Sequence, residues 1–302
     1  MSKVVGRFAP SPSGRMHLGN AFSAMLAWLS VRKADGELVL RMEDLDPERT
    51  NETFAAQIRE DLRWMGLDWD WEGTRQRLRT EAYEQAMESL WQQNLLYPCW
   101  CTRGDLKAAS APHASDGKPI YPGTCRHLTA VQRAEKTRPP LWRLIVPDET
   151  VCFTDGLQGE YWENLARECG DFVVQRADGV HAYQLAVVVD DAAMGVNEVV
   201  RGRDLLDSSP RQIYLQQKLQ MPQPRYYHVP LLLAPDGRRL SKREHDLDMG
   251  ALRERFTPAE LTGRLAFWAG QTDRPELVTP AELAGCFEWK NVPRGDIIVA
   301  QL

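Results

Sequence analysis

The chain has 302 residues, 43% of them hydrophobic, which is enough to bury the core of one large domain or two modest ones. Its net charge of -5 excludes a generally basic protein, so any contact with nucleic acid must come from a local patch. No run approaches the roughly 18 apolar residues of a membrane span, and no signal-peptide pattern is present, so we expect no membrane association and a cytoplasmic location. The six cysteines are expected to be thiols or metal ligands.

Residues 4–43 predict the order strand, loop, helix, strand. A short apolar run precedes a loop that Pro10 and Pro12 keep irregular, and a helix with one apolar face follows over residues 20–33. A second strand ends at Glu43. Such a βαβ unit implies parallel strands, whose carboxyl ends meet at the sheet edge where ligands bind. The loop after the first strand and Glu43 are therefore expected to line one cleft.

Two features of this unit suit a charged ligand. The helix start beside the loop has unpaired N–H groups and a positive dipole end, which suit a phosphate, and Gly19 lets a flat ligand approach the backbone. Three acids then follow one another, Glu43, Asp44 and Asp46. We expect Asp44 or Asp46 to form a turn or to cap a helix, whereas Glu43 is a candidate partner for a substrate ammonium.

A cluster of cysteines is predicted near residue 100. Two cysteines lie two residues apart, and a third follows a loop that can fold back toward them. Three thiolates with one oxygen or nitrogen donor fit tetrahedral zinc, but ordinary thiols are an equal alternative from spacing alone. The candidate ligands are Cys99, Cys101, Tyr121 and Cys125, with His113 and His127 as alternatives to the tyrosine.

The same region is also basic. Residues 99–143 contain eight Lys or Arg against three acids, which indicates either a nucleic-acid contact or a solvated basic face. The remaining predicted elements are helices over residues 51–65 and 76–94, strands over 141–146 and 171–176, a buried strand or helix over 185–189, a helix over 208–218, a last buried strand over 228–233 and a helix over 257–269.

Four strings resemble the glutamyl branch of the class I aminoacyl-tRNA synthetases. They are RFAPSPSGRMHLGN at residues 7–20, RMEDLDPERT at 41–50, FVVQRADGVHAYQLAVVVDD at 172–191 and LSKR at 240–243. Within them, HLGN and LSKR resemble the HIGH and KMSKS signatures of that class. The resemblance implies an α/β fold with a Rossmann-type catalytic domain built on a parallel sheet.

The resemblance also implies a reaction and the residues that carry it. ATP, accompanied by magnesium, would activate L-glutamate, and His17 and Lys242 would stabilise the phosphate charge. Arg7 and Arg201 can form forks with the glutamate carboxylates, in an order that stays open, and Glu43 can take the ammonium. The implied glutamate-binding residues are Arg7, Phe8, Ala9, Pro10, Ser11, Glu43, Tyr183 and Arg201, and the implied ATP-binding residues are His17, Gly19, Asn20, Leu240, Ser241, Lys242 and Arg243.

Length and the pattern CxC…YxxxC resemble a truncated group of this branch, the glutamyl-queuosine tRNA(Asp) synthetases. This resemblance implies glutamate activation without tRNA, transfer to the queuosine base at the wobble position of tRNA(Asp), and an anticodon arm in the cleft. It also implies one structural zinc on Cys99, Cys101, Tyr121 and Cys125, and we expect a monomer. The expected divisions are a first catalytic half (1–96), a zinc-bearing acceptor-binding insertion (97–145), a second catalytic half with the LSKR loop (146–245) and a helical C-terminal segment without an anticodon-binding domain (246–302).

Two other functions fit the same motifs. One is the catalytic core of a conventional glutamyl-tRNA(Glu) synthetase whose anticodon-binding domain is a separate chain. The other is a non-catalytic paralogue that binds tRNA, against which the presence of His17, Glu43, Arg201 and Lys242 argues. A small-molecule adenylyltransferase would share an HLGN-type motif but leaves RFAPSPSG and RMEDLDPERT unexplained.

Overall fold

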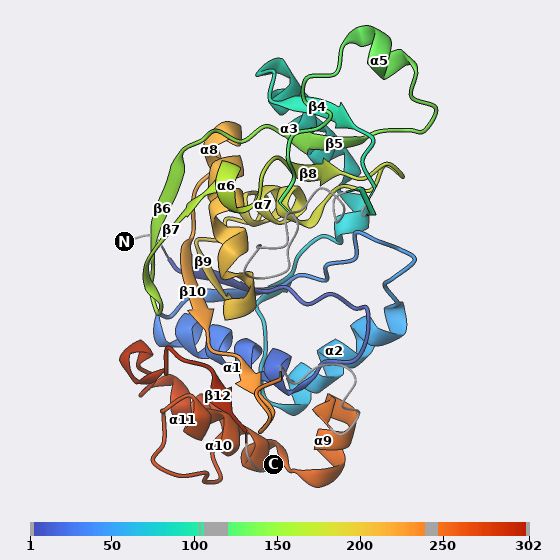
Figure 1. Ribbon diagram of the computed structural model, residues 1–302. Coiled ribbons are helices and arrows are strands. Elements are labelled where there is room, and N and C mark those ends of the chain that lie inside the picture. The colour runs from blue at the N-terminus through green and yellow to red at the C-terminus, as the bar shows by residue number, and fades with distance from the viewer. Residues whose placement is uncertain (1–2, 103, 106–119, 239–246, 300–302) are drawn as a thin grey trace.

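The computed structural model describes residues 3–102, 104–105, 120–238 and 247–299 (Figure 1). Five parallel strands form its central sheet in the order β10-β9-β1-β2-β3, which confirms the predicted parallel α/β architecture. Strands from early and late parts of the chain therefore lie in one sheet. They are β1 (Val5–Phe8), β2 (Glu37–Leu40), β3 (Trp71–Glu72), β9 (Glu198–Gly202) and β10 (Arg225–Val229).

Helix α1 (Leu18–Lys33) is buried on most of its sides. At Gly6 of β1 a Cβ atom would lie 2.4 Å from Val31 Cγ2, so glycine is needed for the helix to lie this close to the strand. The sequence predicted a helix with a single apolar face. The structure differs because α11 (Pro280–Ala284), from the C-terminal segment, packs against α1 as well.

Three helices pack on one another: α3 (Thr80–Gln92), α7 (Tyr183–Ala193) and α8 (Ser209–Leu219). The apolar run at 185–189, which suited a strand or a helix, lies in α7, and its side chains share one buried cluster with α3 and α8. Burial on several sides explains why the run lacks a clear helical period.

The segment between β2 and α3 differs in detail from the prediction. Helix α2 (Glu52–Trp64) is capped by Asn51, whose side chain accepts from the N–H two residues on at 2.7 Å. The expectation that Asp44 or Asp46 forms a turn or caps a helix is confirmed for Asp46, which accepts from the N–H of Glu48 in a turn at 3.2 Å, whereas Asp44 accepts from the N–H of Arg77 at 3.3 Å. The predicted helix over 76–94 is divided into a 3-10 turn, η1 (Gln76–Leu78), and α3.

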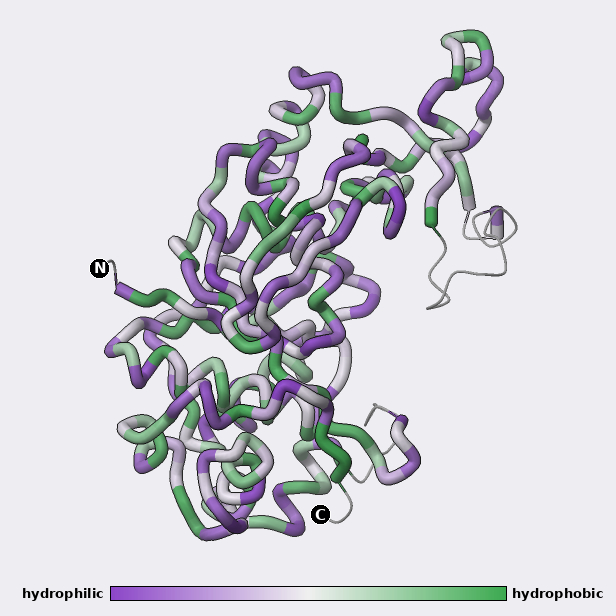
Figure 2. Tube along the Cα trace, turned by 60° about the vertical axis from the view of Figure 1, so that its left-hand side comes forward, coloured by the Kyte–Doolittle hydropathy of each residue, from purple (hydrophilic) through white to green (hydrophobic). Residues whose placement is uncertain are grey.

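A second, antiparallel sheet consists of β4 (Leu96–Cys99), β5 (Leu141–Leu144) and β8 (Phe172–Gln175). The chain between β4 and β5 carries the short helix α5 (Ala130–Ala134), which projects from the rest of the molecule in both views (Figures 1 and 2). The cysteine cluster lies at the end of β4, where Cys99 and Cys101 meet Cys125 from the chain just before α5.

A hairpin that the sequence did not predict runs alongside β10 (Figure 1). It consists of β6 (Thr150–Asp155) and β7 (Gly159–Asn164), and the short helix α6 (Leu165–Glu168) follows it. The N–H of Gly156 in its turn donates to the carbonyl of Tyr226 at 2.8 Å. Its turn therefore lies directly against the central sheet.

The C-terminal segment contains α9 (Met249–Arg255), α10 (Pro258–Trp268), which Thr257 caps, and α11, and it then returns to the strands that precede it. Strand β12 (Ile297–Ile298) pairs in parallel with β11 (Leu232–Leu233). Asp296 Oδ1 accepts from the N–H of Leu231 at 2.9 Å, and its Oδ2 lies 2.6 Å from Arg203 Nη2.

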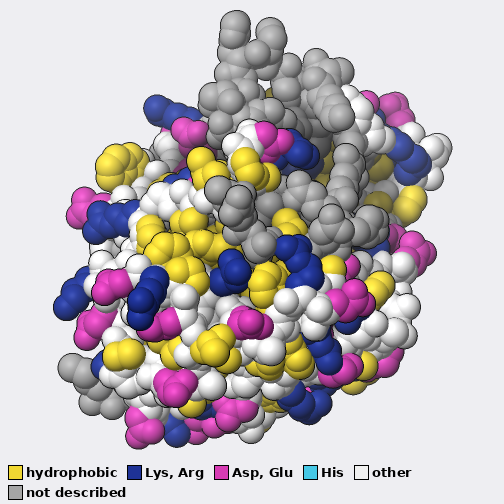
Figure 3. All heavy atoms as spheres, turned by 90° about the horizontal axis from the view of Figure 1, so that it is seen from below, with side chains coloured by type: hydrophobic (Ala, Val, Ile, Leu, Met, Phe, Trp, Pro, Cys, Tyr) yellow, Lys and Arg dark blue, Asp and Glu magenta, His cyan; other side chains and the backbone are white. Residues whose placement is uncertain are grey.

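Two predictions for this region were wrong in part. The last buried strand, predicted over 228–233, is split by Pro230 into the end of β10 and β11, because proline has no N–H for the sheet. The C-terminal segment, predicted as helical, includes β12. Its face of the molecule carries hydrophobic side chains among both positive and negative ones, so no single charge covers it (Figure 3). In the part of the chain that is described, no helix has the length and apolar character needed to cross a membrane.

Candidate active site

A pocket of about 370 Å³ lies at the carboxyl ends of β1, β9 and β10. It brings together every predicted glutamate-binding residue: Arg7, Phe8, Ala9, Pro10, Ser11, Glu43, Tyr183 and Arg201. Three predicted ATP-binding residues also line it, His17, Gly19 and Asn20. The others, Leu240, Ser241, Lys242 and Arg243, lie outside the described residues. The residues meet in one place, while their roles stay predictions.

The loop after β1 and the segment after β2 run side by side, which places Glu43 in the pocket. The N–H of Arg41 donates to the carbonyl of Phe8 at 3.0 Å, and the N–H of Glu43 donates to the carbonyl of Pro10 at 2.9 Å. The strand itself ends at Leu40, three residues earlier than predicted, because the prolines of the neighbouring loop interrupt the regular ladder. Glu43 nevertheless reaches the predicted edge of the sheet.

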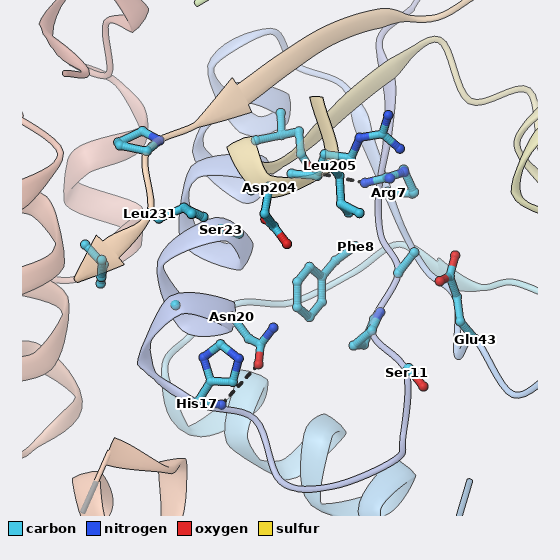
Figure 4. Close-up of a pocket in the computed structure, with 18 of the residues that line it drawn as sticks. Arg7, Phe8, Ser11, His17, Asn20, Ser23, Glu43, Asp204, Leu205 and Leu231 are labelled. Atoms are coloured by element: carbon cyan, nitrogen blue, oxygen red, sulfur yellow. Dashed lines mark hydrogen bonds between the residues drawn. The ribbon is translucent and has the colours of Figure 1, made fainter. Parts of the chain in front are cut away.

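The start of α1 forms one end of the pocket. His17 precedes the helix, and its N–H donates to Asn20 Oδ1 at 3.1 Å (Figure 4). A Cβ atom at Gly19 would lie 3.2 Å from the His17 ring, so residue 19 must stay small for the imidazole to keep this position. In the view of Figure 4, Phe8 is drawn between this end and the end that carries Arg7 and Glu43.

Two buried guanidinium groups form the other end. Arg7 Nη1 donates to the carbonyl of Val200 at 3.0 Å, and Arg7 Nε lies 3.8 Å from Asp191 Oδ2. Burial lowers the pKa of Arg7, although an arginine remains charged at any pH the protein meets. Arg201 is 4% exposed, and its Nη1 donates to Tyr183 Oη at 3.5 Å. Two such groups suit a ligand with two carboxylates.

Glu43 is held from behind by a fully buried arginine. Arg41 Nη2 donates to Glu43 Oε1 at 3.2 Å, and Arg41 Nη1 pairs with Asp191. Burial raises the pKa of Glu43, while Arg41 and Arg7 act in the opposite direction. A ligand ammonium at Glu43 would lower the pKa of this carboxyl again. Its positive charge would stabilise the ionised carboxylate in place of the solvation lost on burial.

Sequence reasoning missed part of the pocket wall. Ser23 lies three residues after Asn20, so helical spacing could have placed it on the same face of α1. Asp204 follows the end of β9, which was also a usable signal. No sequence pattern indicated that the residues after β10 line the pocket, because their position depends on the break in the predicted strand at Pro230. The additional lining residues are Ser23, Val200, Gly202, Asp204, Leu205, Pro230, Leu231 and Leu232.

The cysteine cluster can be tested for its fit to zinc. The thiol sulfurs of Cys99, Cys101 and Cys125 all lie within 4.8 Å of one another, and those of Cys101 and Cys125 are 3.7 Å apart. Zn–S bonds of about 2.3 Å in a tetrahedron place two sulfurs about 3.8 Å apart, so the three thiols suit such an ion. Tyr121 Oη lies 3.4 Å from Cys99 Sγ. Among the described residues His127 is exposed and outside the cluster, and His113 is not described.

A buried arginine supports this cluster. Arg143 Nε donates to Cys99 Sγ at 3.3 Å, and its guanidinium carbon lies 3.7 Å from the centre of the Tyr121 ring. A positive charge at this distance offsets the negative charge that three thiolates would bring together. Arg143 therefore does not contribute to the predicted basic surface.

The fold and pocket define the catalytic domain of a class I tRNA synthetase, and a family model described as "tRNA synthetases class I (E and Q), catalytic domain" matches residues 3–296. Curated proteins named Glutamyl-Q tRNA(Asp) synthetase are similar along nearly the whole chain. The protein of Symbiobacterium thermophilum is 48% identical, covering 96% of this chain and 94% of its own, and that of Nitratidesulfovibrio vulgaris is 46% identical, covering 98% and 95%. The chain therefore belongs to the class I (E and Q) tRNA synthetases and, among them, to the glutamyl-Q tRNA(Asp) synthetase family, and it is an enzyme of the ligase class.

Solved structures agree with this assignment. A glutamate tRNA ligase from Elizabethkingia meningosepticum, determined in complex with its amino acid, superposes with a TM-score of 0.83 at 26% identity and covers 97% of this chain. A glutamate-tRNA synthetase from Elizabethkingia anophelis superposes with a TM-score of 0.86 at 25% identity. This chain spans only 66% and 68% of those two proteins.

Proposed function

We propose that the chain activates L-glutamate with ATP in the absence of tRNA and then joins the glutamate to the queuosine base at the wobble position of tRNA(Asp). The observation that carries the first step is the pocket itself. Arg7, Arg201 and Glu43 offer two forks and one carboxylate at one end, and His17 and Asn20 lie at the start of a helix at the other. A dicarboxylic amino acid and a nucleoside triphosphate match these two ends.

In the activation step an α-carboxylate oxygen of glutamate attacks the α-phosphorus of ATP. The new P–O bond forms as the bond to the bridging oxygen breaks, and pyrophosphate leaves with the electron pair. The protein positions both reactants and neutralises charge, so no covalent nucleophile is required. We assign His17 and Lys242 to the phosphates, where magnesium bound to the triphosphate supplies additional positive charge.

The second step concerns the acceptor. Its support comes from the relatives named Glutamyl-Q tRNA(Asp) synthetase, which align with nearly the whole chain. We propose that the anticodon arm enters the cleft that holds the adenylate, and that a hydroxyl of the queuosine ring attacks the activated carbonyl, with AMP as the leaving group. Cys99, Cys101, Tyr121 and Cys125 would hold one zinc ion, which would keep the chain around α5 in shape next to this acceptor.

The activation step is tested by pyrophosphate exchange. The purified chain should exchange radiolabelled pyrophosphate into ATP when L-glutamate is present and tRNA is absent. Glutamine should support far less exchange, because an amide cannot satisfy a guanidinium fork as a carboxylate does. A requirement for tRNA(Glu) would favour a conventional synthetase core, and no exchange under any condition would favour a non-catalytic tRNA-binding protein.

The acceptor is tested by glutamate transfer. Radiolabelled glutamate should appear on tRNA(Asp) that carries queuosine and not on tRNA(Asp) that lacks it. Periodate treatment of the tRNA, which cleaves the queuosine diol, should abolish transfer. Because periodate also oxidises the 3′-terminal ribose, tRNA(Asp) without queuosine provides the matched control, and label on tRNA(Glu) at its 3′ end would contradict the proposal.

A further inference from the structure

Behind the pocket, a chain of buried hydrogen bonds reaches Arg201 from the hairpin. Asp155 Oδ2 and His228 Nδ1 are 2.6 Å apart, and Arg201 Nε and His228 Nε2 are 2.9 Å apart. Arg201 Nη2 also donates to Ser209 Oγ at 2.8 Å. Asp155, His228 and Ser209 are at most 1% exposed, and none of the three lines the pocket. These residues can act on a ligand only through Arg201.

The partners of His228 fix its protonation state. A guanidinium can only donate, so His228 Nε2 must offer its lone pair to Arg201 Nε. The proton of the neutral ring then lies on Nδ1, where it donates to Asp155 Oδ2. A doubly protonated ring would direct an N–H at the N–H of Arg201. The geometry therefore requires a neutral imidazole with one specified tautomer.

The same contacts fix which edge of Arg201 is available to a ligand. Nε and Nη2 on one edge are occupied by His228 and Ser209. The edge formed by Nη1 and Nη2 is left, next to Tyr183 at the pocket wall. This edge presents two parallel N–H groups, which is the arrangement that binds a carboxylate in a fork. A rotation of the guanidinium would break both rear contacts.

Asp155 is itself held tightly. Its Oδ1 accepts from the N–H groups of Leu157 at 2.9 Å and Gln158 at 2.8 Å, so the turn of the β6–β7 hairpin is built around this carboxylate. The hydrogen bond from the N–H of Gly156 to the carbonyl of Tyr226 holds the turn against β10, and only glycine fits there, because a Cβ atom at Gly156 would lie 2.2 Å from the Tyr227 ring. Gln158 Nε2 also donates to the carbonyl of His228 at 2.7 Å.

We propose that Asp155 and His228 are positioning residues for the amino-acid substrate: Asp155 fixes the tautomer of His228, and His228 fixes the orientation of the Arg201 edge that receives a glutamate carboxylate. The hairpin thereby has a function in substrate selection, although none of its residues reaches the pocket. The inference rests on the proposed function of the site for its substrate, and it adds two residues that act through Arg201.

Two substitutions at one position separate the proposed role from packing. In His228→Gln the side-chain oxygen lies near the place of Nε2 and can still accept from Arg201. In His228→Asn the polar group is too short for this and remains near Asp155. Both variants lose an aromatic ring from the core, so both lose stability. Asp155→Asn keeps the shape of the carboxylate but no longer specifies the tautomer, and Asp148→Asn, an exposed acid paired with Arg167 before the hairpin, is its control.

The main readout is the KM for glutamate against the KM for ATP in pyrophosphate exchange. We expect His228→Asn to raise the KM for glutamate about 10–100-fold and to leave the KM for ATP nearly unchanged, whereas His228→Gln retains most of the wild-type affinity. Asp155→Asn should raise the KM for glutamate, and Asp148→Asn should not. Equal glutamate KM values for the Asn and Gln variants, or parallel losses for both substrates, would overturn the proposal.

A second readout does not depend on catalysis. In ¹⁵N-histidine-labelled full-length protein at neutral pH, the resonances of His228, assigned by comparison with His228→Gln, should show a protonated Nδ1 and an unprotonated Nε2. A protonated Nε2 would sink the positioning role even if exchange activity is normal. Conversely, the expected tautomer in a protein without glutamate-dependent exchange would leave the arrangement around Arg201 intact and would count against the proposed function alone.

Discussion

At the scale of single residues, Glu43 is the group whose loss the pocket can least replace. Buried Arg41 donates to its carboxylate at 3.2 Å, and the Glu43 side chain is only 13% exposed, so a ligand ammonium there would meet a carboxylate with little access to water. Glu43→Gln should raise the KM for glutamate about 30-fold or more, because one member of a buried charge pair is removed. The KM for ATP should change little in pyrophosphate exchange.

The control for this experiment is Glu37→Gln on the same segment. Glu37 is half-buried and pairs with exposed Lys3 at 2.9 Å, away from the pocket, so its loss should leave both KM values near those of the wild type. If Glu43→Gln and Glu37→Gln have the same KM for glutamate, Glu43 does not contact the ammonium.

His228 also predicts how stability depends on pH. Burial lowers the pKa of His228 from 6.5 to about 4, with Asp155 opposing this and Arg201 and Arg7 adding to it. The unfolded chain therefore takes up the proton first as the pH falls. The contribution of neutral His228 to the free energy of unfolding is fully present above about pH 6.5 and is lost between there and about pH 4. At pH 5 the loss amounts to about 2 kcal/mol. Tyr226, stacked on the ring, stays neutral throughout this range.

Urea unfolding at neutral pH and near pH 5 measures this effect. The wild type should lose about 2 kcal/mol more than His228→Gln between the two conditions, since the variant has no imidazole to protonate. Equal losses would mean that His228 is protonated in the folded chain. That result would also disagree with its hydrogen bond from Arg201.

At the residue scale, the side chains that line the pocket could be predicted from the sequence, but the buried residues behind Arg201 could not. Arg7, Glu43, Tyr183 and Arg201 lie in strings with a recognisable order, and the structure brings them to one cavity. Asp155 lies in a hairpin with no motif, and His228 is a single histidine in an apolar strand. Their relation to Arg201 depends on three separate segments meeting, which no local pattern in the chain specifies.

At the scale of elements, periodicity worked where one environment dominates. It placed α2, predicted over 51–65, because the apolar spacing of this helix agrees with its burial along one face. It was ambiguous for α7, whose apolar run is buried on several sides. It missed β6 and β7, because residue type there does not follow burial: Asp155 and Glu163 are buried, whereas Trp162 is 64% exposed.

The spacing of the three cysteine thiols near β4 predicts that the protein binds zinc. The purified protein should contain about one zinc ion per chain, since the three thiols have the spacing of a tetrahedral site. Cys125→Ser should lose this zinc and lower the thermal midpoint, because the segment around α5 has few other buried contacts. Cys286→Ser is the matched control, since Cys286 is exposed and far along the chain. Two results would contradict the site: wild-type protein that is purified without zinc, or a thermal midpoint that a chelator leaves unchanged.

At the scale of the whole molecule, the net charge of -5 repels tRNA, so a local group of basic side chains must provide the attraction. The predicted basic region is smaller than its composition indicates, because Arg143 is buried beside Cys99, while Lys136 and Arg138 remain exposed. Lys136→Gln should weaken binding of tRNA(Asp) and reduce the slope of log affinity against log salt by about 1. Lys290→Gln, an exposed lysine of the C-terminal segment, should change neither. An unchanged slope for Lys136→Gln would exclude a phosphate contact there.

The division of the chain into catalytic halves, insertion and C-terminal segment stays a prediction, but the contacts of the last of these have a consequence for biosynthesis. Asp296 accepts from the N–H of Leu231, and β12 pairs with β11, so one wall of the pocket is held by residues 296–298. The ribosome adds these residues after all the residues that line the pocket. A nascent chain can assemble β1, β2 and α1 early, yet the backbone at Leu231 lacks its partner until residues 296–298 leave the exit tunnel. Maturation of this wall of the pocket therefore waits for the synthesis of residues 296–298.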